Sequence, residues 1–469
     1  MPRTLTNTAI GLLIGGLAGA TVYAQPIRYT LTPLGDLAGG EFKSIATGLN
    51  ESGEVVGAGT SDTDRIATIW TKATGMQVLT NELVGFFSSR AESINNAGIS
   101  VGEYTVDPGG FENGRAWVWD GVNLRTPLND NPDISYSRFQ NINENNIVAG
   151  WAGTQPSNFT EIGIVYDYDN DTITQLNGPG IGPRTTVKRV TLSGLAGGTW
   201  TRVDGTATFT SIWDLNDPDP NATRFDLPTL PGFAHHARMT INDAGSVIGN
   251  ASNDRQFGDR TPWLWNQGDP DLTPLGLFPG FASTSGATLN DDGSILVGNA
   301  YDAKLGDGVG VLMFENTDWI DVNELIDESG AAYIVTRLRE INDDNWLVGD
   351  AINQRSGEME GVLLRPCEFT ATIEGSCPGR IECNVTCGTP GGQFVWLFSE
   401  NTGNFVVPGG PCAGTQLGLD ENARIVRRAD LDRNGEGGGV VVLNDNFCGG
   451  FLQAVDIESC AVSEVIQIR

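Results

Sequence analysis

Hydrophobic and polar residues alternate in short runs along most of this chain, and one such run returns at nearly regular intervals. Its clearest copy, residues 240–251, has an apolar residue before an Asn, a polar turn after it, and then a β-branched pair and a Gly. Alternation with a period of two, broken by turn residues, predicts short β-strands joined by hairpins. The other copies are anchored on Asn50, Asn95, Asn143, Asn290 and Asn342.

The interval between Asn143 and Asn242 is about twice the others, so a further copy is expected near its middle. Residues 190–193 fit there when Ser193 is aligned with Asn242. The chain then contains seven units of about 48 residues. A fixed period of this length is typical of repeat architectures.

The turn of each unit has two positions that demand particular residues. The third residue after the Asn must accept a positive φ, and only Gly or Asn stands there: Gly53, Gly98, Asn146, Gly245, Gly293 and Asn345. A second Gly follows the β-branched pair, and we expect it to pack closely against the neighbouring unit: Gly57, Gly102, Gly150, Gly249, Gly298 and Gly349.

Four short strands fit into each unit, the third ending in an aromatic residue such as Trp70 or Trp265. Antiparallel strands in fours at this period are typical of a β-propeller blade. Residues 27–34 form one alternating strand with no partners before it, and the last unit, ending at residues 361–364, lacks its fourth strand. We therefore predict an all-β, seven-bladed propeller whose ring is closed by the N-terminal strand.

The combined pattern of Ser-x-Ala, Ile-Asn-x-x-Gly-x-Val-Val-Gly, Ala-x-x-Trp and a closing Leu-Gly resembles the HAF repeats of secreted bacterial extracellular proteins over about residues 28–366. The His-Ala-Phe triplet of that family is absent; residues 67–69 and 116–118 hold its place. The resemblance implies a secreted, propeller-like protein without established catalytic residues.

Three segments are expected from composition. Residues 1–24 have a basic start, an apolar stretch and a small-residue cleavage site, which predicts a signal peptide. Residues 25–366 form the propeller. All seven cysteines lie in residues 367–469, which indicates a separate immunoglobulin-like β-sandwich held by disulfides. Parts of this tail, among them residues 389–392 and 410–415, resemble a C-terminal domain found on many secreted bacterial proteins.

The cysteine pairing stays open at this stage. The candidates are Cys367, Cys377, Cys383, Cys387, Cys412, Cys448 and Cys460, and the one pair that we expect is Cys412 with Cys448. Cys383 and Cys387 share one face of an expected strand and should not pair with each other.

The charge balance limits the partners. The chain has 28 basic and 58 acidic residues, a net charge of −30, which disfavours nucleic acid and anionic membranes. Beyond the signal peptide no apolar stretch is long enough to span a bilayer. The expected location is outside a bacterial cell, at its surface or in the periplasm, with an extracellular glycan or protein as partner.

Four cations are prominent in this acidic chain. Five residues before the anchor of their units stand Arg90, Arg138, Lys188 and Arg337, where the innermost strand would line the channel. A ring of positive charge at the channel mouth predicts an anionic ligand such as a uronate. Pairing of these cations with acids of neighbouring blades is the alternative.

Metal and catalytic signals are sparse. Asp430, Asp432 and Asn434 match the first half of a calcium loop, although a simple turn explains them too. Calcium is thus the one cofactor expected, if any. His235 and His236 are the only histidines and are expected on a surface loop; Glu92 and Glu340 fall on innermost strands.

The sequence therefore predicts a non-catalytic binding module. Two alternatives remain: a propeller-type glycoside hydrolase or lyase using carboxylates near the axis, and a structural protein of the cell envelope.

Overall fold

We describe the protein from a computed structural model, which defines residues 27–39, 41–61, 65–106, 114–154, 160–179, 184–253, 259–302, 308–315 and 317–469. The expected signal peptide, residues 1–24, lies outside the described residues. Contacts divide the chain into one unit of Tyr29–Pro366 and another that contains Cys367–Arg469. No helix in the described part of the chain is long and apolar enough to cross a membrane.

Antiparallel strands in successive groups of four make up the first unit. The first three groups are β2 (Ser44–Leu49), β3 (Val55–Thr60), β4 (Arg65–Thr71) and β5 (Gly75–Val78); β6 (Ser88–Ile94), β7 (Ser100–Thr105), β8 (Gly114–Trp119) and β9 (Leu124–Arg125); and β10 (Tyr136–Ile142), β11 (Ile147–Thr154), β12 (Thr160–Asp167) and β13 (Thr172–Leu176). The next three are β14 (Arg184–Val190), β15 (Leu195–Thr201), β16 (Thr208–Asp214) and β17 (Phe225–Asp226); β18 (His235–Ile241), β19 (Val247–Ser252), β20 (Thr261–Trp265) and β21 (Thr273–Pro274); and β22 (Ser283–Leu289), β23 (Ile295–Tyr301), β24 (Gly308–Phe314) and β25 (Ile320–Asp321). The last group combines β26 (Tyr333–Ile341), β27 (Leu347–Asn353) and β28 (Met359–Pro366) with β1 (Tyr29–Pro33).

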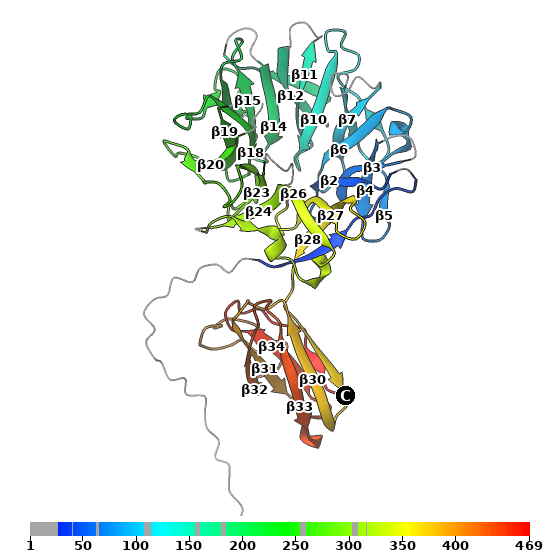
Figure 1. The fold of residues 1–469 in the computed structure, drawn as a ribbon, viewed down its shortest axis with the longest axis vertical. Helices are drawn as coiled ribbons and strands as arrows, with labels where there is room; N and C mark the ends of the chain where they lie inside the picture. Colours follow the sequence, from blue (N-terminus) through cyan, green and yellow to red (C-terminus); the bar gives the residue numbers. More distant parts are fainter. Residues whose placement is uncertain are drawn as a thin grey trace, which may run out of the picture. The chain divides into compact units, whose positions relative to one another are not determined.

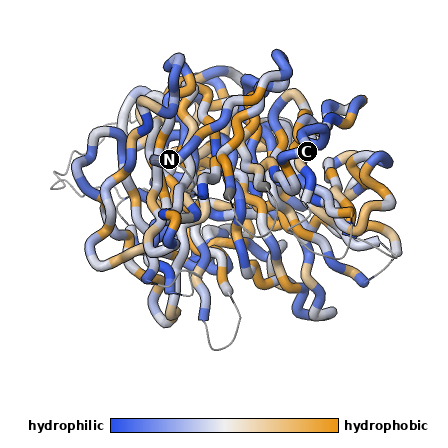
Figure 2. The backbone as a smooth tube through the Cα atoms, turned by 90° about the horizontal axis from the view of Figure 1, so that it is seen from above, coloured by the Kyte–Doolittle hydropathy of each residue, from blue (hydrophilic) through white to orange (hydrophobic). Residues whose placement is uncertain are grey.

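The arrangement is propeller-like. The first strands β2, β6, β10, β14, β18 and β26 lie toward the middle of the unit, whereas later strands such as β5 and β20 lie farther out (Figure 1). Short 3-10 turns occupy Asn81–Leu83, Val322–Glu324 and Glu328–Gly330. Hydrophobic and hydrophilic residues alternate at short intervals along the backbone, as half-buried strands require (Figure 2).

The two ends of this unit complete each other. Strand β1 pairs antiparallel with β28, so that Tyr29 lies opposite Pro366 and Pro33 opposite Val362. The prediction that the N-terminal strand completes the last group is confirmed.

The predicted turn chemistry is also confirmed, since every anticipated Gly and Asn has a positive φ, from 59° at Asn146 to 80° at Gly245. In the fourth group the anchor is Thr191 rather than Ser193. Its backbone carbonyl accepts from Gly194, and its hydroxyl accepts from the N–H of Leu195. The sequence alignment of this group was wrong by two residues, because Thr replaces the expected Asn.

Each inner strand has a bulge three residues before its anchor, as at Gln140 between β10 and β11. The Gly opposite makes room for it: a Cβ on Gly150 would lie 2.1 Å from the carbonyl oxygen of Arg138. The second Gly of the repeat thus serves its own group, and the expectation that it packs against the neighbouring unit was wrong. A bulge re-aims side chains, so positions two and three before the anchor both face the channel.

The anchor amides join neighbouring groups. Asn50 Nδ2 donates to the carbonyl of Asn95 at 3.1 Å, and Asn95 Nδ2 donates to that of Asn143 at 3.1 Å. The series returns to its start, because Asn342 Nδ2 donates to the carbonyl of Asn50 at 3.4 Å. The repeated Asn therefore fastens adjacent sheets as well as shaping its turn.

The second unit contains two sheets around one core. Strands β29 (Thr370–Gly375), β30 (Gly379–Thr386) and β33 (Gly437–Leu443) form one; β32 (Arg424–Asp430), β31 (Gln393–Ser399), β34 (Phe451–Asp456) and β35 (Ile466–Gln467) form the other. A 3-10 turn spans Asp445–Phe447. Ile381 of the first sheet and Trp396 of the second lie in the same apolar cluster, which makes this unit a β-sandwich.

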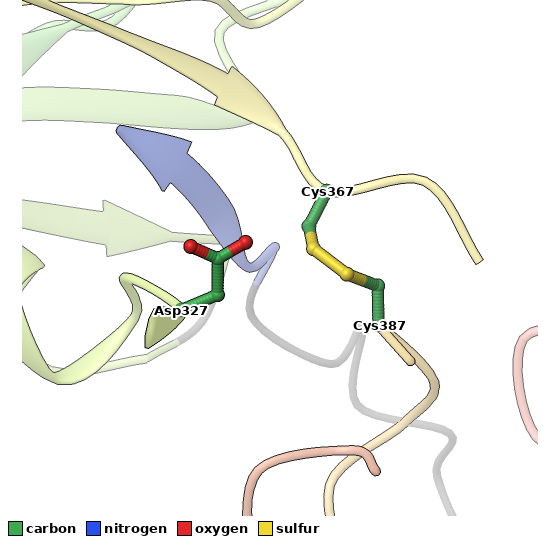
Figure 3. Close-up of side chains that lie close together, drawn as sticks. All are labelled: Asp327, Cys367 and Cys387. Carbon is green, nitrogen blue, oxygen red and sulfur yellow. A yellow bond between two sulfur atoms is a disulfide. The ribbon is translucent and has the colours of Figure 1, made fainter. Parts of the chain in front are cut away.

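Three disulfides hold the sandwich: Cys367–Cys387 (Figure 3), Cys377–Cys448 and Cys412–Cys460. The predicted Cys412–Cys448 pair was wrong, because each of these cysteines meets a different partner brought near by the fold. Cys383 is buried and unpaired, and it does not bond Cys387, as its place on the strand indicated.

Candidate functional site

The inner strands of the first unit surround a cavity of about 630 Å³, which we call the cationic cavity. Two carboxylates, Glu92 and Glu340, line it together with the aromatic side chains of Trp151 and Tyr301. Its basic lining residues are Arg90, Arg138, Lys188, Arg238, Arg337 and Arg339.

A smaller pocket of about 400 Å³ shares three of these arginines, and we call it the five-cation pocket. Lys43 and Arg65 complete its basic lining beside Arg90, Arg337 and Arg339, and none of the described residues that line it is a carboxylate. Eight of the 28 basic residues of the chain thus line two adjoining cavities, although the protein carries a net charge of −30. Such clustering focuses a positive potential that attracts anions.

All four predicted cations line the cationic cavity. Arg90, Arg138 and Arg337 occupy equivalent positions of their strands, five residues before the anchor. Lys188 does not, because the anchor of its group is Thr191, and it stands at the bulge instead. The sequence alignment thus identified a residue that does line the cavity, although it placed the anchor of this group two residues too late.

Two of the four are paired with acids. Arg90 and Arg138 both contact Glu92, and Arg90 also lies 3.3 Å from Glu103. Burial raises the pKa of Glu103 to about 7 against the opposing attraction of Arg90. The alternative of pairing with a neighbouring group therefore holds for Arg138, whereas Arg90 pairs with acids of its own group. Among the described residues, Arg337 and Lys188 form no ion pair with a carboxylate.

Lys188 is held by polar and aromatic neighbours. Its Nζ donates to Oε1 of Gln140 at 3.0 Å and lies 4.1 Å from the centre of the Trp151 ring. Burial lowers the pKa of Lys188 to about 8, although Glu161 attracts the ammonium. A lysine in this state can accept a proton near neutral pH.

Four further cations that line the two cavities were missed by the sequence alignment, and one of them, Lys43, precedes β2. Arg65 begins β4, Arg339 stands at a bulge, and Arg238 has a φ of 52° beside another bulge. Arg339 pairs with Asp350, while Arg65 and Arg238 have no acidic partner within the described ranges. Only the bulges direct Arg238 and Arg339 into the channel, and no alternation of apolar and polar residues signals a bulge.

Arg189 closes the inner end of the cationic cavity. Its Nη1 donates across the channel to Glu340 at 2.8 Å and to the hydroxyl of Thr288 at 3.4 Å. Beyond this bridge lies a third cavity of about 110 Å³, lined by acids that directly follow the anchors. These are Glu51, Glu144, Asp243, Asp291 and Asp343, which we call the acidic ring.

The remaining candidates lie elsewhere. The expectation of a surface loop for the two histidines was wrong: both are buried in β18, and Nε2 of His236 accepts the N–H of Leu230 at 2.8 Å. Asp432 uses its Oδ1 to accept the N–H groups of Asn434 and Glu436, as a turn does, while Asp430 accepts from Gln393. Calcium binding by Asp430, Asp432 and Asn434 stays a prediction.

No protein-family model and no curated protein matches this chain. Among solved structures, it resembles an oligogalacturonate lyase from Vibrio parahaemolyticus, with 13% identity and a TM-score of 0.44 over 72% of this chain and 97% of that one. It also resembles a puromycin-hydrolyzing peptidase from Mycobacterium tuberculosis, with 12% identity and a TM-score of 0.44 over 76% of this chain and 58% of that one. A gluconolactonase from Xanthomonas campestris has 10% identity and a TM-score of 0.36 over 61% of this chain and 89% of its own.

These three structures are enzymes, so the expectation of a non-catalytic binding module is corrected: the comparison gives it no support. The identities limit the likeness to a β-propeller-like fold, and no activity passes from these proteins to this chain.

Proposed function

We propose that this protein is an enzyme that cleaves a uronate-containing glycan by β-elimination in the cationic cavity. The observation that carries the proposal is the gathering of cations around one cavity of a strongly acidic protein, with Lys188 among them. An anionic sugar is the substrate class that such a cavity attracts.

The elimination needs two kinds of group, and the cavity offers both. Guanidinium groups stabilise the negative charge that develops on the uronate carboxylate, and Arg238 and Arg337 have no competing acid among the described residues. Lys188, when neutral, takes the proton from C5 of the uronate. The C–H electrons form the C4–C5 double bond, the C4–O bond breaks, and the leaving oxygen takes a proton back from the Lys188 ammonium.

Elimination fits the cavity better than hydrolysis does. A glycoside hydrolase uses two carboxyl groups, one of them free to act as acid and the other as base or nucleophile. The two carboxylates that line the cavity are both engaged: Glu92 contacts Arg90 and Arg138, and Glu340 contacts Arg189.

The test is an assay of the secreted chain against a panel of polyuronates, with neutral glucans as controls. Elimination creates a C4–C5 double bond that absorbs in the ultraviolet, whereas hydrolysis incorporates oxygen from labelled water. We expect ultraviolet absorbance with a polyuronate and none with neutral glucans. Reducing ends that form without this absorbance would replace elimination by hydrolysis, and no cleavage of any polyuronate would remove the proposal.

We further propose that the groups of four strands are the blades of a seven-bladed ring and that the protein works outside the cytoplasm. Three disulfides support export, because disulfides persist in oxidising compartments. Membership among the HAF repeats stays a prediction. Amino-terminal sequencing of the exported protein tests cleavage after residue 24.

A further inference from the structure

The five-cation pocket differs from the cationic cavity in its lining. Two carboxylates line the cationic cavity. The described lining of the five-cation pocket has none, and its basic residues are Lys43, Arg65, Arg90, Arg337 and Arg339. These residues come from three groups of strands: Lys43 precedes β2, Arg65 begins β4, Arg90 lies in β6, and the other two lie in β26. Their charged groups therefore approach one space from several directions.

Only part of this charge is paired with acids that the structure describes. Arg90 pairs with Glu92 and Glu103, and Arg339 pairs with Asp350. Lys43, Arg65 and Arg337 make no ion pair with any acid that the structure describes. Burial, with the charge of Arg90 beside it, lowers the pKa of Arg65 to about 10. The surroundings of Arg65 therefore disfavour its charged form. Keeping this charge costs free energy unless a nearby anion compensates it.

We propose that the five-cation pocket binds a doubly charged tetrahedral oxyanion, a sulfate or phosphate group. A carboxylate has one charge and two oxygens in one plane, which suits a single guanidinium. A tetrahedral dianion has acceptor oxygens that point in several directions and can accept hydrogen bonds from cations on separate strands. The pocket adjoins the cationic cavity through Arg90, Arg337 and Arg339.

The oxyanion has two possible sources, a free inorganic ion or an ester on the glycan. The second source rests on the proposed function, because a sulfated uronate chain would place its carboxylate in the cationic cavity and its ester in the adjoining pocket. The first source is independent of catalysis.

Inorganic sulfate is the first probe. Its binding to the full chain is measured by calorimetry and by thermal unfolding against sodium chloride of equal ionic strength. We expect saturable binding of sulfate, and we expect Arg65→Gln and Lys43→Gln each to weaken it roughly tenfold or more. Lys72→Gln is the matched control, because Lys72 is exposed in the same group of strands and lines neither cavity.

Arg65→Gln should fold, since it removes a charge that burial and Arg90 disfavour, and its far-ultraviolet circular dichroism checks this. Sulfate that stabilises the wild type no more than chloride would overturn the proposal. So would sulfate binding that Arg65→Gln and Lys43→Gln leave unchanged.

A second probe separates the sources: one uronate oligosaccharide with and without a sulfate ester. Tighter binding of the sulfated form, with the advantage lost in Arg65→Gln, assigns the pocket to an ester of the ligand. Equal binding of the two forms beside saturable sulfate binding assigns it to a free oxyanion. Failure of the elimination assay leaves the sulfate result untouched, so the two proposals can fail separately.

Discussion

At the scale of single residues, the proposed elimination depends on the protonation of Lys188. Only the neutral amine accepts a proton, and burial brings the pKa of Lys188 to about 8. We expect kcat/KM to rise about tenfold per pH unit below about pH 8 and to level off above it. Lys188→Met should lower kcat/KM by about 10²- to 10⁴-fold. A profile that is flat across this range would exclude Lys188 as the base.

The stability of the same variant distinguishes a catalytic from a structural role. A lysine whose pKa is lowered by folding destabilises the folded state when protonated. The pKa of Lys188 is about 8 in the folded protein and about 10.4 in the unfolded chain. The contribution of Lys188 to stability therefore improves as the pH rises between these two values. At pH 7 Lys188→Met should melt no lower than the wild type, while Lys72→Met should leave both activity and melting unchanged. A large loss of stability in Lys188→Met would indicate that Lys188 supports the fold instead.

At the scale of the strands and turns, one missing amide sets the fourth group apart. The anchor Asn143 donates its Nδ2 to the carbonyl of Thr191 at 2.9 Å, but Thr191 has no amide to continue the series. What remains is the bond in which Asp243 accepts the N–H of Leu192 at 2.7 Å, which has equivalents between other neighbouring groups. The fourth and fifth groups are therefore joined by one fewer anchor amide than most other neighbouring groups.

Thr191→Asn should restore this amide and stabilise the fold by about 1 kcal/mol, the net value of one hydrogen bond. The reverse change, Asn95→Thr, removes the donor to Asn143 and should cost about as much. Denaturant unfolding of both variants beside the wild type measures these shifts. Equal and unchanged midpoints would show that the amides shape only their own turns.

The features that could be predicted from the sequence are those that recur in nearly every repeat. The turns at Gly245 or Asn345 recur in nearly every unit, so the strands and the pairing of β1 with β28 could be predicted. The bulges could not, because each depends on which residue, such as Gln140 or Arg339, is left unpaired across its hairpin. The same holds for the candidate site. Arg90 and Arg138 could be predicted because they occupy equivalent positions of the repeat. Arg65 and the bridge from Arg189 to Glu340 could not, because they depend on contacts between distant groups.

At the scale of the whole first unit, the channel is divided by charge. The bridge from Arg189 to Glu340 separates the cationic cavity from the acidic ring. Several members of this ring also join neighbouring groups, since Glu51 accepts the N–H of Asp343 at 3.1 Å. Carboxylates crowded in this way repel one another, and backbone N–H groups that donate to Glu51, Glu144 and Asp243 offset part of this repulsion.

The acidic ring should make stability depend on pH. Burial, with the charge of Asp291 nearby, raises the pKa of Asp343 to about 7. A carboxyl whose pKa is raised by folding binds its proton more tightly in the folded state, so the folded state gains stability as the pH falls from about 7 toward about 4. We expect the melting temperature to rise over this range. Asp343→Asn should raise it at pH 7 and flatten its slope, whereas Asp130→Asn, at an exposed turn outside the ring, should not. A wild-type melting temperature that falls between pH 7 and 5 would mean that the backbone hydrogen bonds to these carboxylates outweigh their mutual repulsion.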